Sequence, residues 1–159
     1  MSAITQSFVQ KKSATSLIYR FIAAWLLLIC SAFGATANET EPFISGYDVV
    51  SYFRDTGPLE GRPDFSARHN SHNLWFATQE NLNDFLLEPD KYMPAYNGYC
   101  AYGMVFGMIS EVDPLQYDII DGALYLQLDS GTKRRFNRRL KRNIKKSKRA
   151  WNKLSASAE

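Results

Sequence analysis

Apolar and polar residues alternate along residues 64–69, and an apolar segment follows at 74–77. The stretch between them, 70–73, is rich in turn-forming Asn and Ser. A period of two is typical of a strand with one buried face, and His69 lies on the apolar side of the first strand. The pattern therefore predicts a β-hairpin from residue 64 to residue 77.

A second hairpin is predicted by the segments 117–120 and 123–128. The dipeptide Asp121-Gly122 lies between them and is a preferred two-residue hairpin turn. Alternate residues of its second strand should face the core: Leu124, Leu126 and Leu128.

A helix is predicted over Gln79–Leu87, with Thr78 as its N-cap and Pro89 at its end. Its expected apolar face consists of Leu82, Phe85 and Leu86. Farther upstream, Asp48 is expected to cap a short helical turn. That turn would direct three side chains inward: Val49, Tyr52 and Phe53.

The chain from Thr132 to its end is predicted to form one long helix, because it lacks Pro and Gly and is rich in helix-forming residues. Apolar residues recur there at helical spacing: Phe136, Leu140, Ile144, Trp151 and Leu154. No internal repeat is visible in the sequence. Together these elements predict an α+β fold, with a small antiparallel sheet of hairpins, a packed helix and a long basic C-terminal helix.

Residues 1–37 have the pattern of a cleavable signal peptide. A basic segment precedes the apolar run 21–30, which is shorter than the roughly 20 residues needed to span a bilayer. The small-residue motif Ala35-Thr36-Ala37 follows, so we expect cleavage after Ala37 and a periplasmic or secreted protein. An uncleaved anchor and a lipoprotein signal at Cys30 are the alternatives. The expected organisation is then a signal peptide at 1–37, an α+β domain at 38–132 and a basic amphipathic helix at 133–159 that packs on the domain.

Charge is divided unevenly along the mature chain. Residues 38–132 carry a net charge of −11, whereas residues 133–159 carry +11. Export argues against nucleic acid as the partner of the basic segment. Two interpretations remain open: the helix docks on its own acidic domain, or it binds an anionic membrane surface or an acidic protein partner. We expect a monomer.

Cys100 is the main candidate for chemistry, because Cys30 leaves with the signal peptide. A soft metal such as copper could be held by Cys100, His69 and Met104. A buried structural thiol and a thiol-based redox protein are the alternatives. His72 is expected to be solvated. Met93 and Met108 could also supply thioether ligands to Cu(I), but packing is the expected role of both. The dense tyrosines could line a ligand pocket or fill the core: Tyr47, Tyr52, Tyr92, Tyr96, Tyr99 and Tyr102.

Catalytic motifs are missing from the sequence. It contains no Gly-rich phosphate loop, no His-x-x-x-His, no Cys-x-x-Cys and no Gly-x-Ser-x-Gly, and its acids show no paired spacing typical of acid–base catalysis. We therefore expect a non-enzymatic binding module.

Several segments together carry a family resemblance: Gly46–Phe53, His69-Asn70, Phe76–Tyr92, Tyr96–Tyr102, Asp121–Leu126 and Trp151–Leu154. In combination they resemble the exported YHS-domain proteins of bacteria, over residues 44–154. The resemblance implies a link to a superfamily of heavy-metal transporters and sensors, in which cysteines of a strand–helix segment bind metal. The corresponding segment here, Phe76–Asn81, has no cysteine, so that metal site is absent from this chain.

Overall fold

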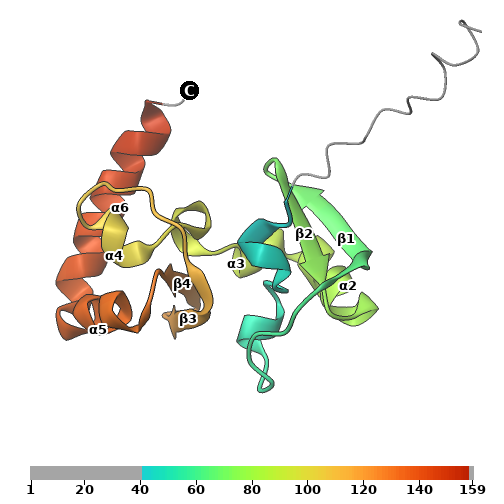
Figure 1. Ribbon diagram of the computed structural model, residues 1–159. Coiled ribbons are helices and arrows are strands. Elements are labelled where there is room, and N and C mark those ends of the chain that lie inside the picture. Colours follow the sequence, from blue (N-terminus) through green and yellow to red (C-terminus); the bar gives the residue numbers. More distant parts are fainter. Residues whose placement is uncertain (1–40, 158–159) are drawn as a thin grey trace, which may run out of the picture. The chain divides into compact units, whose positions relative to one another are not determined.

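Two antiparallel hairpins form the β-structure of residues 41–157, the part of the chain that this computed structural model describes (Figure 1). The first pairs β1, Arg62–His69, with β2, His72–Phe76. The second pairs β3, Asp113–Ile120, with β4, Ala123–Gln127. Each hairpin is a separate two-stranded sheet. The α+β class is confirmed, whereas the expected signal peptide lies outside the described residues.

Helical elements, all short except the last one with its 17 residues, surround the hairpins. Before and after the first hairpin lie η1 (Phe43–Gly46), η2 (Ser51–Phe53), α2 (Gln79–Leu87) and α3 (Pro89–Tyr92). Around the second hairpin lie η3 (Ala95–Gly98), α4 (Ala101–Met104), α5 (Ser130–Arg138) and α6 (Leu140–Ala156). No helix within residues 41–157 is both long enough and apolar enough to cross a membrane.

The order of elements shows an internal repeat that the sequence conceals. A 3-10 turn, a second short helical element, a hairpin and two successive helices occur once from η1 to α3 and again from η3 to α6. Both hairpins close with a two-residue turn, at Asn70-Ser71 and at Asp121-Gly122. The strand register shifts at the matching place in both hairpins, between Arg62 and Ser66 in the first and between Asp113 and Tyr117, 51 residues later, in the second. The repeat is therefore one of backbone architecture, and it is not visible in the sequence.

The same left-handed turn opens both repeats. Ile44 and Ser45 have φ values of 51° and 53°. Their counterparts in the second repeat, Tyr96 and Asn97, have φ values of 59° and 55°. A glycine with positive φ follows in each case, 84° at Gly46 and 81° at the second turn. Non-glycine residues seldom adopt this region, so its double occurrence in the same order indicates one architecture built twice.

Each repeat has its own hydrophobic cluster. Phe85 of α2 lies fully buried in the first cluster, and Phe136 of α5 lies fully buried in the second. The sheet face of β4 that carries Leu124 and Leu126 belongs to the first cluster, while Tyr125 on the opposite face belongs to the second. Strand β4 therefore separates the two clusters and contributes to both.

Two predicted core residues are exposed. Leu86 is 61% exposed, because the inner face of α2 carries Asn81 and Phe85 instead. Leu128 is 45% exposed, because β4 ends one residue earlier, at Gln127. The predicted bounds of α2 and its Thr78 cap, which accepts a hydrogen bond from the Asn81 N–H, are confirmed.

The predicted long C-terminal helix is confirmed as α6, but it does not extend back to Thr132, because the chain bends at Arg139 and α5 is a separate helix. Arg139 has φ −135° and ψ 48°, close to the −139° and 62° of Glu88, which separates α2 from α3. Asp129 and Thr132 form a capping box that starts α5. The apolar residues of α5 and α6 pack on α4 and η3, and the Ser147 hydroxyl lies 2.7 Å from the hydroxyl of Tyr96.

Candidate anion-binding site

The buried carboxylate of Asp48 organises the first repeat. One oxygen accepts hydrogen bonds from the N–H groups of Val50, at 2.8 Å, and Ser51, at 3.3 Å. The other accepts from the Ala77 N–H at 2.8 Å and from the Asn81 side-chain amide at 2.6 Å. Asp48 therefore joins η2 to the junction of β2 and α2, and every bond it makes stays inside the fold.

Cys100 takes the place of Asp48 in the second repeat. Its sulfur accepts hydrogen bonds from the N–H groups of Gly103, at 3.4 Å, and Leu128, at 3.3 Å, the counterparts of two Asp48 donors. The thiol donates to the side-chain oxygen of Gln127 at 3.6 Å. The residue is 1% exposed. These contacts give the thiol a structural position like that of Asp48.

The structure does not bring the three predicted metal ligands together. The ring of His69, with its Nε2 buried and lacking a hydrogen-bond partner among the described residues, packs edge-on against Phe85 in the first cluster. Met104 is fully buried in the second cluster. Strand β1 and helix α4 lie on opposite sides in Figure 1. Residues 41–157 contain no group of three or more His, Cys, Asp or Glu that could hold a metal.

The remaining candidates have packing roles except Met108, for which the expectation of packing is wrong because its side chain is 58% exposed. His72, expected to be solvated, is partly buried, stacks on Phe43 at 4.0 Å and lies 2.8 Å from the side-chain oxygen of Asn97. Met93 packs against the first cluster, whereas Met108 is exposed. All six tyrosines named above belong to one of the two clusters or pack against it.

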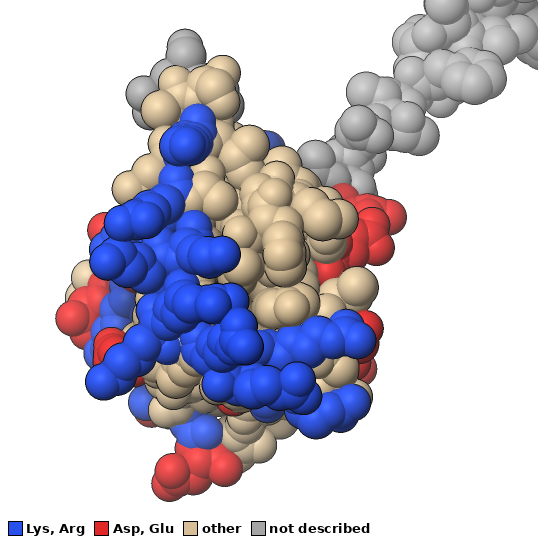
Figure 2. Space-filling view, turned by 90° about the vertical axis from the view of Figure 1, so that its left-hand side faces the viewer, with Lys and Arg blue, Asp and Glu red and all other residues tan. Residues whose placement is uncertain are grey.

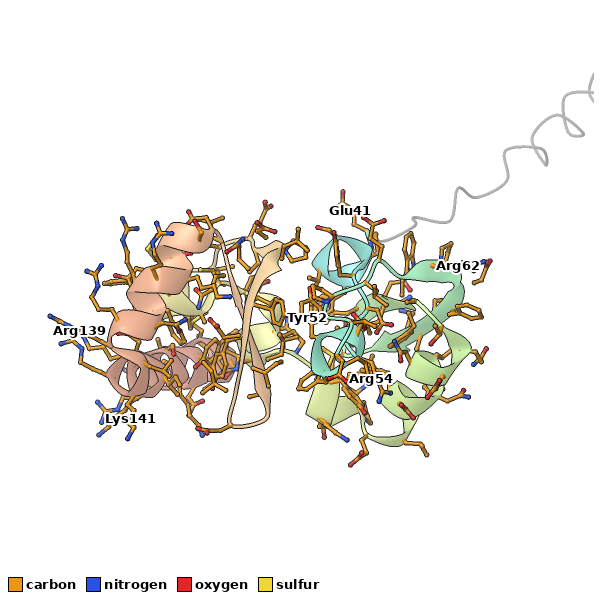
Figure 3. All side chains as sticks on the ribbon, turned by 90° about the horizontal axis from the view of Figure 1, so that it is seen from below. Glu41, Tyr52, Arg54, Arg62, Arg139 and Lys141 are labelled. Atoms are coloured by element: carbon orange, nitrogen blue, oxygen red, sulfur yellow. The ribbon has the colours of Figure 1, made fainter. Side chains whose placement is uncertain are left out.

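A basic face covers the outer side of α5 and α6 (Figure 2). Twelve Lys and Arg residues lie between 133 and 153, and within the described part of the chain only Lys133 of these forms an ion pair, at 3.5 Å from Asp118. Seen from below, Arg139 and Lys141 point away from the hairpin that carries Arg62 (Figure 3). Ion pairs with the acidic residues before 133 therefore neutralise little of the charge of this basic face.

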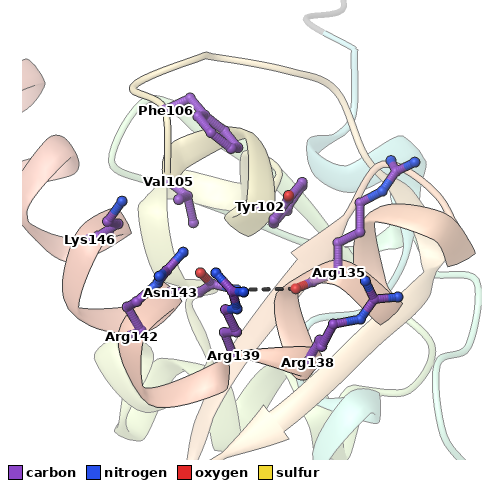
Figure 4. Close-up of a pocket in the computed structure, with 9 residues that line it drawn as sticks. All are labelled: Tyr102, Val105, Phe106, Arg135, Arg138, Arg139, Arg142, Asn143 and Lys146. Atoms are coloured by element: carbon purple, nitrogen blue, oxygen red, sulfur yellow. Dashed lines mark hydrogen bonds between the residues drawn. The ribbon is translucent and has the colours of Figure 1, made fainter.

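The bend at Arg139 turns part of this face into a pocket of about 180 Å³ (Figure 4). Asn143 fixes the bend, because its side-chain amide donates to the carbonyls of Phe136, at 2.8 Å, and Arg135, at 3.2 Å. Side chains of α4 and of the residues just after it face the bases across the pocket. The lining residues are Tyr102, Val105, Phe106, Arg135, Arg138, Arg139, Arg142, Asn143 and Lys146.

Five cations share this pocket without an anionic neighbour in its lining. Two like charges about 8 Å apart repel by about 0.5 kcal/mol in bulk water, and by more beside a poorly polarisable wall such as Phe106. A bound anion would relieve this repulsion. Guanidinium groups match phosphate and carboxylate oxygens with paired N–H donors. Four of the nine lining residues are arginines and one is a lysine, so the pocket offers many N–H donors to an anion.

The first repeat shows that the fold does not need these bases. Asp84, Leu87 and Glu88 occupy the positions that correspond to Arg135, Arg138 and Arg139. The helix that follows is also much shorter, because α3 has four residues whereas α6 has 17. The basic pocket is therefore an addition to a fold that forms without it.

Sequence reasoning found the basic segment but missed the pocket. The density of Lys and Arg was visible, yet a straight helix would spread these residues along one side. Their convergence depends on the bend at Arg139 and on Tyr102 and Phe106, which approach from a distant part of the sequence.

The fold and this site define an α+β protein of two repeats with a basic pocket on its surface. Comparisons with protein-family models, curated proteins and solved structures find no match for the chain. The resemblance to exported YHS-domain proteins therefore stays a prediction.

Proposed function

We propose that the protein is an exported, non-enzymatic binding module whose basic pocket on α5 and α6 binds phosphate groups of an anionic partner. The main support is the set of converging arginines, Arg135, Arg138, Arg139 and Arg142, which form no ion pair among the described residues. The acidic and apolar residues at the corresponding places of the first repeat support a functional rather than a structural reason for them.

The apolar stripe of α6 is not free to bind this partner. Leu140, Ile144 and Trp151 pack against the second cluster, and Asn143 and Ser147 between them are buried. Insertion of that stripe into a membrane would require the helix to leave its own domain. The outer, charged face is therefore the surface that meets the partner.

The test measures binding of inorganic pyrophosphate by calorimetry at low salt. The pocket variant is Arg139→Gln/Arg142→Gln, and the matched control is Lys141→Gln/Lys148→Gln, which removes the same charge from exposed α6 positions outside the pocket. Charged hydrogen bonds contribute about 1.5–3 kcal/mol each, so the pocket variant should bind at least about tenfold more weakly than the control. Equal losses in both variants, or no binding by the wild type, would contradict the proposal.

The soft-metal hypothesis has its own test. Cu(I) titration of the wild type and of Cys100→Ala measures whether the thiol holds metal. Because Cys100 is buried and hydrogen-bonded within the fold, we expect the same negligible uptake by both proteins. Stoichiometric uptake that Cys100→Ala abolishes would restore the hypothesis.

A further inference from the structure

The loop after α4 exposes three large apolar side chains next to the basic pocket. Phe106 is 65% exposed, Met108 58% and Ile109 60%. Between them, Gly107 adopts φ 72°, and a side chain placed there would meet no atom within 4 Å. Apolar residues gathered at a loop tip in this way mark interaction sites, whereas single exposed apolar residues are ordinary.

The first repeat again serves as a reference. The corresponding loop, between η2 and Leu59, consists of Arg54–Pro58 and is mostly polar. Both loops close in the same way, since the Asp48 N–H donates to the Leu59 carbonyl at 2.9 Å and the Cys100 N–H donates to the Ser110 carbonyl at 3.1 Å. The loop of the first repeat therefore closes without a run of exposed apolar residues at its tip, although Leu59 at its end is 38% exposed.

Bases border this apolar loop on two sides. Phe106 lines the basic pocket, and together with Gly107 it also lines a second hollow, whose charged residues are Lys146, Arg149 and Lys153. In Figure 2 the basic residues follow two edges of an uncharged area. An apolar tip bordered by long, flexible cations matches a bilayer with anionic headgroups, where the tip enters the acyl region and the cations remain at the headgroups.

We propose that the protein docks on an anionic lipid bilayer by inserting the Val105–Ile109 loop, while the bases of α5 and α6 bind the lipid phosphates. This inference rests on the proposed function and names the bilayer as the source of the phosphate groups. The rigid domain supplies the charged face, and the loop supplies the apolar contact that the packed stripe of α6 cannot provide.

The test uses the purified protein and sedimentation with vesicles of phosphatidylcholine containing about a third phosphatidylglycerol. The loop variant is Met108→Ser/Ile109→Ser, since neither residue lines the basic pocket. The matched control is Leu86→Ser/Leu87→Ser, which removes two exposed apolar side chains from the first repeat. The loop variant should lose at least about tenfold in vesicle affinity and keep its pyrophosphate affinity, while the control should keep both.

Insertion has a separate readout in Met108→Trp. On vesicle binding, its added fluorescence should shift to shorter wavelength and be quenched by lipids brominated on their acyl chains, relative to the wild type. Pyrophosphate binding without vesicle binding would overturn the bilayer inference alone, and would point to an acidic protein or soluble phosphate as the partner. Equal vesicle binding by the loop variant and the control, or an unshifted tryptophan, would overturn insertion. Absence of binding to pyrophosphate and vesicles alike would overturn the proposed function as well.

Discussion

Removal of the Asp48 carboxylate should destabilise the protein far more than removal of the thiol that occupies the same position in the second repeat. In Asp48→Ala, the N–H groups of Val50 and Ala77 and the amide of Asn81 lose an acceptor at 2.6–2.8 Å. A buried donor without a partner costs about 1–3 kcal/mol. Allowing for water that reaches part of the gap, we expect a loss of about 3–5 kcal/mol.

The matched variant is Cys100→Ala. Its sulfur is a weak acceptor, and its bonds to Gly103 and Leu128 are longer, 3.4 and 3.3 Å. We therefore expect a loss of only about 1–2 kcal/mol. The free energy of unfolding of a small domain is about 5–15 kcal/mol, so the two variants should differ clearly in their denaturation midpoints.

The assay is urea unfolding followed by tryptophan fluorescence. Trp75 lies in the first repeat and Trp151 packs against Tyr96 in the second, so the described residues provide a probe in each. Asp48→Asn keeps one acceptor oxygen, so its free energy of unfolding should lie between those of the wild type and Asp48→Ala. If Asp48→Ala and Cys100→Ala differ by less than about 1 kcal/mol, the assignment of Asp48 as the main polar link of the first repeat is wrong.

Other variants and conditions test further features of the fold. The Cys100 thiol should react with iodoacetamide only after unfolding, because it is 1% exposed; rapid alkylation of the native protein would contradict this. Burial raises the pKa of Tyr96 to about 12 from an ordinary value near 10. The neutral hydroxyl is therefore favoured in the folded state, and stability should be intact below pH 10 and fall between pH 10 and 12, less so in Tyr96→Phe; an equal fall in both would refute the assignment. Gly98→Ala should destabilise more than Gly107→Ala in thermal unfolding, since both have positive φ but only the Gly98 methyl would lie 2.9 Å from Phe43; equal losses would show that this contact relaxes.

Local signals in the sequence were sufficient for the hairpins and for α2. The alternation of apolar and polar residues predicted the strands, and Asp121-Gly122 predicted one turn. Thr78 and Pro89 predicted the two ends of the helix. These signals act over a few residues and do not depend on the rest of the chain. The predicted turn at 70–73 is two residues longer than the observed turn at Asn70-Ser71. The two-residue turn was not recognised because neither residue is a glycine, although both adopt positive φ.

The C-terminal bend could not be predicted from sequence, because no helix-breaking residue marks it. Arg139 leaves the helical conformation where Phe136 packs on Tyr125 and α6 turns to pack on α4. The Asn143 side-chain amide then donates hydrogen bonds to carbonyls at the end of α5. Tertiary packing overrides helix propensity here, and the basic pocket exists only because of it.

The repeat escaped detection because the two halves share a backbone and few side chains. Asp48 and Cys100 differ in charge and size, yet both accept N–H groups from the same two places of the repeat. What the position requires is an acceptor atom, and a carboxylate and a sulfur both provide one. The interpretation of Cys100 as a metal ligand started from its being a lone thiol, whereas its structural counterpart gives it a role in the fold. The residues without such a counterpart are instead the arginines of the pocket and the apolar loop, so these are the parts of the second repeat for which folding offers no explanation.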